Sequence, residues 1–276
     1  MTAEYYHLRL VNYLRLSGSK SVSTLTVYKN TLDLILARFP DPEKADLLEI
    51  QEFALTFKND NTRKNVCVLL RWLFNRCLNR NIQWYELPYP KKKQKVQPVY
   101  TEQDIMKVLQ VVINPKQKAI LALIIDCGLR VSEPCAIRLS DCNSKARSII
   151  LRSAKGDNDR TVYPSAAVWE FIKQYWTAWK ATRPKKYLFE GAAPGTPYTE
   201  TSIRAFVKAG CRKTKVKYLG THAIRRFTGT WEIENLVPLT VTAAKFGHRS
   251  TRTLEKHYVI HSPAYLKQTA SPLAAR

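Results

Sequence analysis

Residues 221–258 read THAIRRFTGTWEIENLVPLTVTAAKFGHRSTRTLEKHY, and the fold and chemistry of the chain are organised around this stretch. It holds His222 and Arg225 three positions apart, then His248 and, ten positions later, Tyr258. Residues three apart on a helix share a face, so the first two side chains are expected to lie together. Arginine supplies fixed positive donors, histidine moves protons near neutral pH, and tyrosine can act as a covalent nucleophile. This order indicates attack on a phosphodiester.

Three helices are expected within the stretch. Thr221 is expected to cap the first helix, and Pro238 begins a second one that ends at Gly247. Ser250 or Thr251 is expected to cap the last helix, which leads to the tyrosine. The second histidine should therefore lie just beyond a helix end.

A buried helix and a tight turn are expected further upstream. Residues 116–126 are strongly apolar and predict a buried helix that ends near Gly128. Arg130 follows directly, and Ser132 is expected to cap a short helix from Glu133 to Leu139. An arginine in such a junction either pairs with the nearby glutamate or points into a site, and the pattern leaves both interpretations open.

The same part of the chain contains a strand pattern. Residues 147–152 and 160–163 read as two strands joined by a turn, and Lys155 lies in that turn. A loop lysine taken alone is usually solvated. Helices are predicted at 165–179 and 199–212. The expected fold class is mainly α with a small antiparallel β-sheet (α+β).

The N-terminal part, residues 1–88, shows four helical patterns and no strand pattern. We expect it to be a small helical domain that binds DNA, followed by a linker at 89–99 and a catalytic domain at 100–276. The fourth helix is basic on one face, which is either a solvated surface or a phosphate contact. The linker combines prolines with lysines, and we prefer a DNA-tracking linker over a nuclear-localisation signal. The candidate DNA-binding residues are Arg63, Lys64, Arg71, Lys91, Lys92, Lys93 and Lys95.

Composition limits the class of partner. The 276 residues carry 45 basic against 22 acidic side chains, a formal net charge of +23. Nucleic acid is the leading partner for such a surplus, and an anionic membrane surface is the weaker one. No apolar run reaches the ~20 residues of a membrane span, and no secretion signal is evident. The six cysteines form no C-x-x-C pair. We therefore expect reduced thiols, no zinc site and a cytoplasmic location.

Five short motifs together resemble the tyrosine recombinase (phage integrase) family. Each motif alone is weak, but their combination and order are specific, and the resemblance extends over residues 99–265. The motifs are Gly128-Leu-Arg130-Val-Ser-Glu133, Ala154-Lys155-Gly156, His222-Ala-Ile-Arg225, Gly247-His248 and Tyr258.

The resemblance implies a role for each matching residue. Tyr258 would attack the scissile phosphate to give a 3′-phosphotyrosyl intermediate, and Lys155 would protonate the leaving 5′-oxygen. Arg130 and Arg225 would stabilise the transition state, with a further hydrogen bond donated by His248. The remaining roles are proton transfer at the tyrosine by His222 and support of the arginine-bearing turn by Glu133.

The function implied is that of a site-specific DNA recombinase, or integrase, of a mobile element. It would act on double-stranded DNA as a tetramer through a Holliday junction, with accessory DNA-bending proteins as optional partners. No metal or other cofactor is expected, since no carboxylate cluster suited to two metal ions stands beside the motifs. Two alternatives stay open: a non-catalytic DNA-binding regulator on the same fold, and an enzyme like the type IB topoisomerases. His257 and Tyr265 are rival candidates for the proton carrier and the nucleophile.

Overall fold

The chain folds into two compact units, Met1–Lys95 and Val96–Arg276. The computed structural model describes residues 2–18, 22–83, 85–90, 97–152, 159–178, 184–248 and 250–257. Within these ranges, the side chains of residues 22, 23, 253, 256 and 257 are left undescribed. The assignment of the first unit to DNA binding and of the second to catalysis stays a prediction. No helix in the described ranges has the length and apolarity needed to cross a bilayer.

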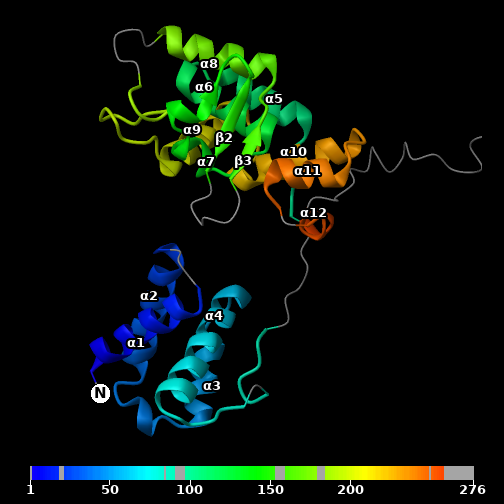
Figure 1. Ribbon diagram of the computed structural model, residues 1–276. Coiled ribbons are helices and arrows are strands. Elements are labelled where there is room, and N and C mark those ends of the chain that lie inside the picture. Colours follow the sequence, from blue (N-terminus) through cyan, green and yellow to red (C-terminus); the bar gives the residue numbers. More distant parts are fainter. Residues whose placement is uncertain are drawn as a thin grey trace, which may run out of the picture. The chain divides into compact units, whose positions relative to one another are not determined.

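The N-terminal unit is a bundle of helices (Figure 1). Capping residues mark the starts of two of its helices. Asp46 forms a capping box at the third helix, and Asn59 caps the fourth. The fourth helix continues into a π-helical segment at Trp72–Cys77. The core contains fully buried aliphatic side chains from successive helices, including Leu10 and Leu70. The four α-helices are α1 (Ala3–Leu16), α2 (Val22–Arg38), α3 (Leu47–Leu55) and α4 (Asp60–Arg71).

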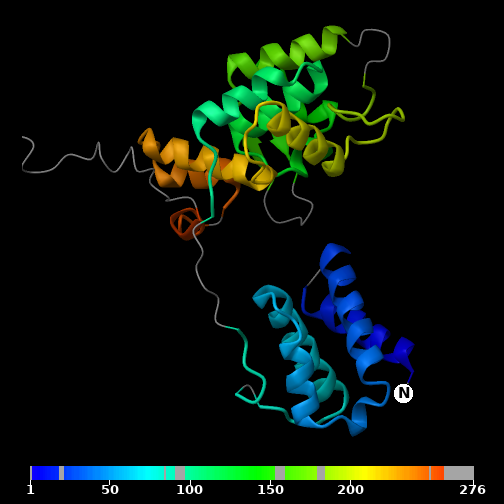
Figure 2. The same ribbon diagram turned by 180° about the vertical axis from the view of Figure 1, so that it is seen from behind.

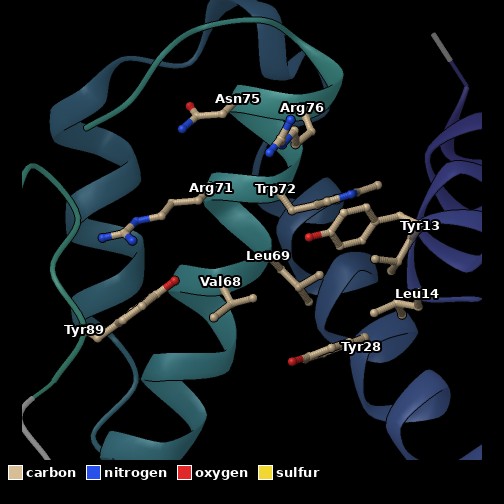
Figure 3. Close-up of a pocket in the computed structure, with 11 residues that line it drawn as sticks. Tyr13, Leu14, Tyr28, Val68, Leu69, Arg71, Trp72, Asn75, Arg76 and Tyr89 are labelled. Carbon is tan, nitrogen blue, oxygen red and sulfur yellow. The ribbon is translucent and has the colours of Figure 1, made fainter. Parts of the chain in front are cut away.

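The chain that leaves this bundle packs back onto it. Leu87 is buried, and its carbonyl oxygen accepts a hydrogen bond from the guanidinium of Arg71. The same guanidinium lies 4.3 Å from the ring centre of Tyr89. Figure 3 shows Arg71 extending from α4 toward Tyr89, on the opposite side of the helix from the Trp72 side chain. Residues 87–89 therefore belong to the helical unit.

The C-terminal unit is built around α6 (Pro115–Cys127), which packs against α8, α9 and α10. Asn114 caps its start by accepting a hydrogen bond from the Gln117 backbone, and Pro115 occupies the first turn. Residues 119–124 are all buried, which the apolar run predicts. Figure 2 shows α6 and α8 side by side. The other helices are α5 (Glu102–Val111), α7 (Glu133–Ala136), α8 (Ala166–Ala178), α9 (Glu200–Lys213), α10 (Thr221–Glu234), α11 (Leu239–Phe246) and α12 (Arg252–His257).

The sheet is antiparallel with the strand order β1-β2-β3. Its strands are β1 (Cys142–Asn143), β2 (Ser148–Leu151) and β3 (Arg160–Val162). Ile149 pairs with Val162, and both side chains are buried in the core of the unit. The mainly α fold with a small antiparallel sheet is confirmed. The two-residue strand β1 is an addition to the predicted hairpin.

Three local predictions are wrong. The helix that begins at Glu133 ends at Ala136 instead of Leu139, because Ile137 turns to extended backbone and its carbonyl accepts from the Leu188 N–H. Ser132 makes no side-chain cap there, since its own backbone is already helical. Thr221 does not cap α10 either. Gly220 holds the cap position with φ +83°, and Thr221 is the first helical residue.

Candidate active site

Arg225 holds the ends of two helices together from within α10. Its side chain is 1% exposed and donates to the carbonyl oxygens of Gly128 at 2.6 Å and Phe246 at 2.8 Å. These carbonyls belong to the C-terminal ends of α6 and α11, where backbone acceptors lack helical partners and the helix dipole favours positive charge. The guanidinium also lies 4.3 Å from the ring centre of Phe246. Arg225 is therefore oriented by the scaffold before any ligand is bound.

Two glycines allow this close approach. Gly128 ends α6 at φ +61°, and a Cβ built there would lie 2.3 Å from Cε1 of Phe246. Gly247 ends α11 at φ +66°, and a Cβ there would lie 3.0 Å from Cδ of Arg160. Both positions have a left-handed backbone, which favours glycine, and Gly128 also leaves no room for a side chain. The glycines predicted at these helix ends therefore also set the packing around Arg225.

Glu133 lies within a cluster of three arginines. Its carboxylate accepts from the Arg130 backbone N–H at 2.7 Å and from the Arg130 side chain at 3.0 Å. Arg160 binds both carboxylate oxygens, at 2.8 and 2.9 Å, and Arg225 lies 3.8 Å away. Burial alone would raise the pKa of the Glu133 carboxyl, but the hydrogen bonds and charges of these arginines lower it below its usual value. The carboxylate stays ionised, and the cluster keeps an excess of positive charge.

Arg130 combines the two interpretations that the sequence leaves open. Its side chain pairs with Glu133, yet it remains 47% exposed. The guanidinium of Arg130 is thus partly exposed, whereas that of Arg225 is buried. The site therefore has N–H donors both near the surface and within the fold. Such an arrangement suits an anionic group that approaches from solvent.

The two histidines differ in their surroundings. His248 lies directly after Gly247, and its Nε2 is 3.2 Å from a terminal nitrogen of Arg225. A guanidinium can only donate, so as a hydrogen bond this contact has Nε2 as its acceptor. The donated hydrogen bond that the resemblance implies for His248 stays a prediction. His222 lies in the first turn of α10, one turn before Arg225, with an exposed side chain.

Several predicted site residues lie outside the described part of the chain. Lys155, Tyr258 and Tyr265 are among them, and for His257 only the backbone is described. Lysines 91–93 and 95 lie outside it as well. Among the described residues, the structure brings together Arg130, Glu133, Arg225 and His248.

The basic face of α4 has partners within its own unit. Arg63 donates through Nε to the Phe57 carbonyl at 2.9 Å, and Arg71 is engaged with Leu87 and Tyr89. Lys64 is exposed, with its ammonium 5.9 Å from the centre of the tyrosine ring. Two of the three candidate DNA contacts thus hold protein segments in place. Their contact with DNA stays a prediction.

Arg160 is the site residue that the sequence patterns do not indicate. It begins β3, is 11% exposed, and donates through Nε to the Lys245 carbonyl at 2.7 Å while it binds Glu133. A single arginine in a predicted strand carries no signal of this role, because its carboxylate partner is 27 positions away. Within the described ranges, no group of three His, Cys, Asp or Glu side chains is arranged to hold a metal.

The fold matches solved recombinase structures. A lambda integrase dimer bound to a COC′ core site aligns over 92% of this chain and 97% of its own, with a TM-score of 0.73 and 15% identity. The XerA recombinase structure aligns over 96% of both chains, with a TM-score of 0.58 and 20% identity. These likenesses define the fold as that of the tyrosine recombinases.

Sequence comparison gives the family. The model of the phage integrase family matches residues 99–264, so the chain belongs to this family. The Sinorhizobium fredii protein y4eF, which carries the name integrase/recombinase, is 30% identical over 205 residues, 74% of this chain and 80% of its own. For y4qK of the same organism, identity is 29% over 205 residues, which span 65% of that protein. Tyrosine recombinase XerA of Pyrococcus horikoshii is 24% identical over 245 residues, 88% of this chain and 85% of its own.

Proposed function

We propose that this protein is a site-specific DNA recombinase, or integrase, that cleaves and rejoins DNA through a 3′-phosphotyrosyl intermediate. The observation that carries the proposal is the cluster around Glu133, in which Arg130 and Arg225 present positive charge in a member of the phage integrase family. A phosphoryl group in transfer carries charge on its equatorial oxygens, and fixed guanidinium donors stabilise that charge.

The roles proposed for the side chains give a balanced reaction. The Tyr258 oxygen attacks phosphorus while the bond from phosphorus to the 5′-oxygen breaks. His222 assists removal of the tyrosine proton, and Lys155 protonates the leaving oxygen. A free 5′-hydroxyl then attacks the phosphotyrosyl bond, which restores the tyrosine and rejoins the strand. Every step is a transfer at one phosphate, so the scheme needs neither metal nor nucleotide.

The proposed substrate is double-stranded DNA with a specific site, bound by a tetramer. Support comes from relatives of the same fold: a lambda integrase tetramer is bound to a Holliday junction, and the XerH recombinase is bound to difH substrate. The net charge of +23 fits a partner with a phosphate backbone. We assign phosphate contacts to the lysines of 91–95 and to Lys64, and we place the reaction in the cytoplasm, with accessory DNA-bending proteins as optional partners.

The decisive experiment is covalent trapping on nicked suicide duplexes, which lose a short strand after cleavage and so prevent rejoining. A randomised duplex library is exposed to the full chain, and DNA attached to protein is recovered and sequenced. We expect a defined site to be enriched, and we expect Tyr258→Phe to bind that site without forming an adduct. An adduct that persists in Tyr258→Phe would show that Tyr258 is not the nucleophile. Tyr265→Phe, which removes the rival tyrosine, is the matched control and should still form the adduct.

The same assay separates the alternatives. Tight, footprinted DNA binding with no adduct on any duplex would identify a non-catalytic DNA-binding protein. Relaxation of supercoiled plasmid without an enriched site would identify an enzyme of the topoisomerase type. A discrete site that yields an adduct and recombines with a second copy supports the proposed recombinase.

A further inference from the structure

Arg160 is placed where it can position the carboxylate of the cluster around Glu133. Each of its three guanidinium nitrogens is within hydrogen-bonding distance of a protein acceptor: both oxygens of Glu133 and the carbonyl oxygen of Lys245. These bonds tie the side chain to Glu133 and to the last turn of α11. Its role must therefore be exerted through the groups that it holds.

The geometry around Glu133 shows what this hold achieves. Glu133 and Arg225 form a long salt bridge, with 3.8 Å between the nearest atoms, which is beyond hydrogen-bonding distance. Both carboxylate oxygens are hydrogen-bonded by Arg160 instead. The described hydrogen bonds of Arg225 go instead to uncharged acceptors, the carbonyls of Gly128 and Phe246 and the ring of His248. These acceptors orient the guanidinium without neutralising it.

A second contact ties Arg160 to the helix that precedes His248. The Nε of Arg160 bonds the carbonyl of Lys245 in the last turn of α11, and its Cδ packs against Gly247. One side chain thus joins β3, α7 and the end of α11. Displacement of Arg160 would alter the Glu133 carboxylate and the His248 backbone together.

We propose that Arg160 is a positioning residue for the strand-cleavage reaction, which keeps the Glu133 carboxylate at salt-bridge distance from Arg225 and prevents a direct hydrogen bond between the two. This inference rests on the proposed recombinase function. Without Arg160, a shift of about 1 Å would turn this long salt bridge into a direct, hydrogen-bonded pair between the carboxylate and Arg225. That pair would compete with the phosphate for the same donors.

The test is a double-mutant cycle in the full chain, on the duplex recovered by covalent trapping. Arg160→Gln is expected to slow adduct formation by about 100-fold. Its DNA affinity in the same salt should change by less than about threefold, because the side chains that reach phosphates are unaltered. Glu133→Gln in the Arg160→Gln background removes the competing carboxylate and should restore about tenfold of the missing rate. Arg160→Lys keeps one charge but cannot bind both oxygens, so its rate should fall between those of the unaltered chain and Arg160→Gln.

The controls separate positioning from folding. Arg204→Gln removes an arginine from an exposed ion pair with Glu200 on α9 and should leave the adduct rate unchanged. If Arg160→Gln does not fold, as judged by urea unfolding, the cycle is run with Arg160→Lys and Glu133→Gln.

Two results would overturn the inference. One is an unchanged adduct rate in Arg160→Gln, and the other is a double variant no faster than Arg160→Gln itself, which would indicate a purely structural arginine. Absence of adduct with the unaltered chain on every duplex would instead contradict the proposed function, before any Arg160 variant is considered.

Discussion

Replacing Gly128 with alanine tests the packing between α6 and α11. The substitution acts in two ways: a side chain at φ +61° is strained, and the new Cβ would lie 2.3 Å from the ring of Phe246. A left-handed backbone costs roughly 1–2 kcal/mol for a residue other than glycine. Overpacking of a filled core costs about 1–3 kcal/mol more, and the Phe246 ring is fully buried, so it has no room to swing out. We expect a decrease of roughly 2–5 kcal/mol in the free energy of unfolding.

Gly195→Ala isolates the backbone cost. Gly195 has φ +76°, and nothing lies within 4 Å of a Cβ built there, so its substitution should cost only about 1–2 kcal/mol. Urea unfolding of both variants is analysed with one common m-value. The difference between their losses of unfolding free energy is the cost of the clash with Phe246. The double variant Gly128→Ala/Phe246→Leu lacks the ring and should lose less stability than the sum of the two single variants. The expected coupling free energy is roughly 1–3 kcal/mol. Equal decreases in both alanine variants, or no coupling with Phe246, would refute the proposed clash.

Three further outcomes are expected. The lowered pKa of Glu133 means that its ionised form stabilises the fold above its usual pKa of 4.5, and that this stabilisation disappears as the pH falls through the folded-state value. Urea unfolding should therefore show the largest deficit of Glu133→Gln at neutral pH and none in acid. Arg225→Lys should slow adduct formation by at least about 100-fold, because one ammonium cannot bond both helix-end carbonyls and stack on the ring. Glutamine at the lysines of 91–95 should flatten the plot of log DNA affinity against log salt by about 0.9 for each phosphate that is no longer neutralised. An unchanged slope would show that this segment does not follow the backbone.

Local signals account for most of the helices. The run at 116–126 predicts α6 because its residues are apolar on every face, and Asn114 and Gly128 supply its two ends. The strands follow from β-favouring residues on either side of a turn, and the small sheet is confirmed. Residue types and their order also point to Arg130, Arg225 and His248, which the structure places together with Glu133.

Long-range contacts are what the sequence does not reveal. Arg160 and Glu133 are 27 positions apart, and neither the strand pattern nor the turn pattern specifies their bidentate pair. The end of the short helix α7 is mispredicted for the same reason. Ile137 leaves the helical conformation to bond Leu188, a partner about 50 positions away that overrides local preference. The contact between His248 and Arg225, which are 23 positions apart, is likewise set by the fold and not by local sequence.

The capping of two helix ends by one guanidinium also determines which length changes the chain can accommodate. An added residue within α6 or α11 would rotate its terminal carbonyl by about 100° around the helix axis and carry it off the guanidinium of Arg225. Insertions in the connecting loops leave both carbonyls in place. Variation in chain length among working variants of this unit should therefore fall between its helices, and the lengths of α6 and α11 should stay fixed.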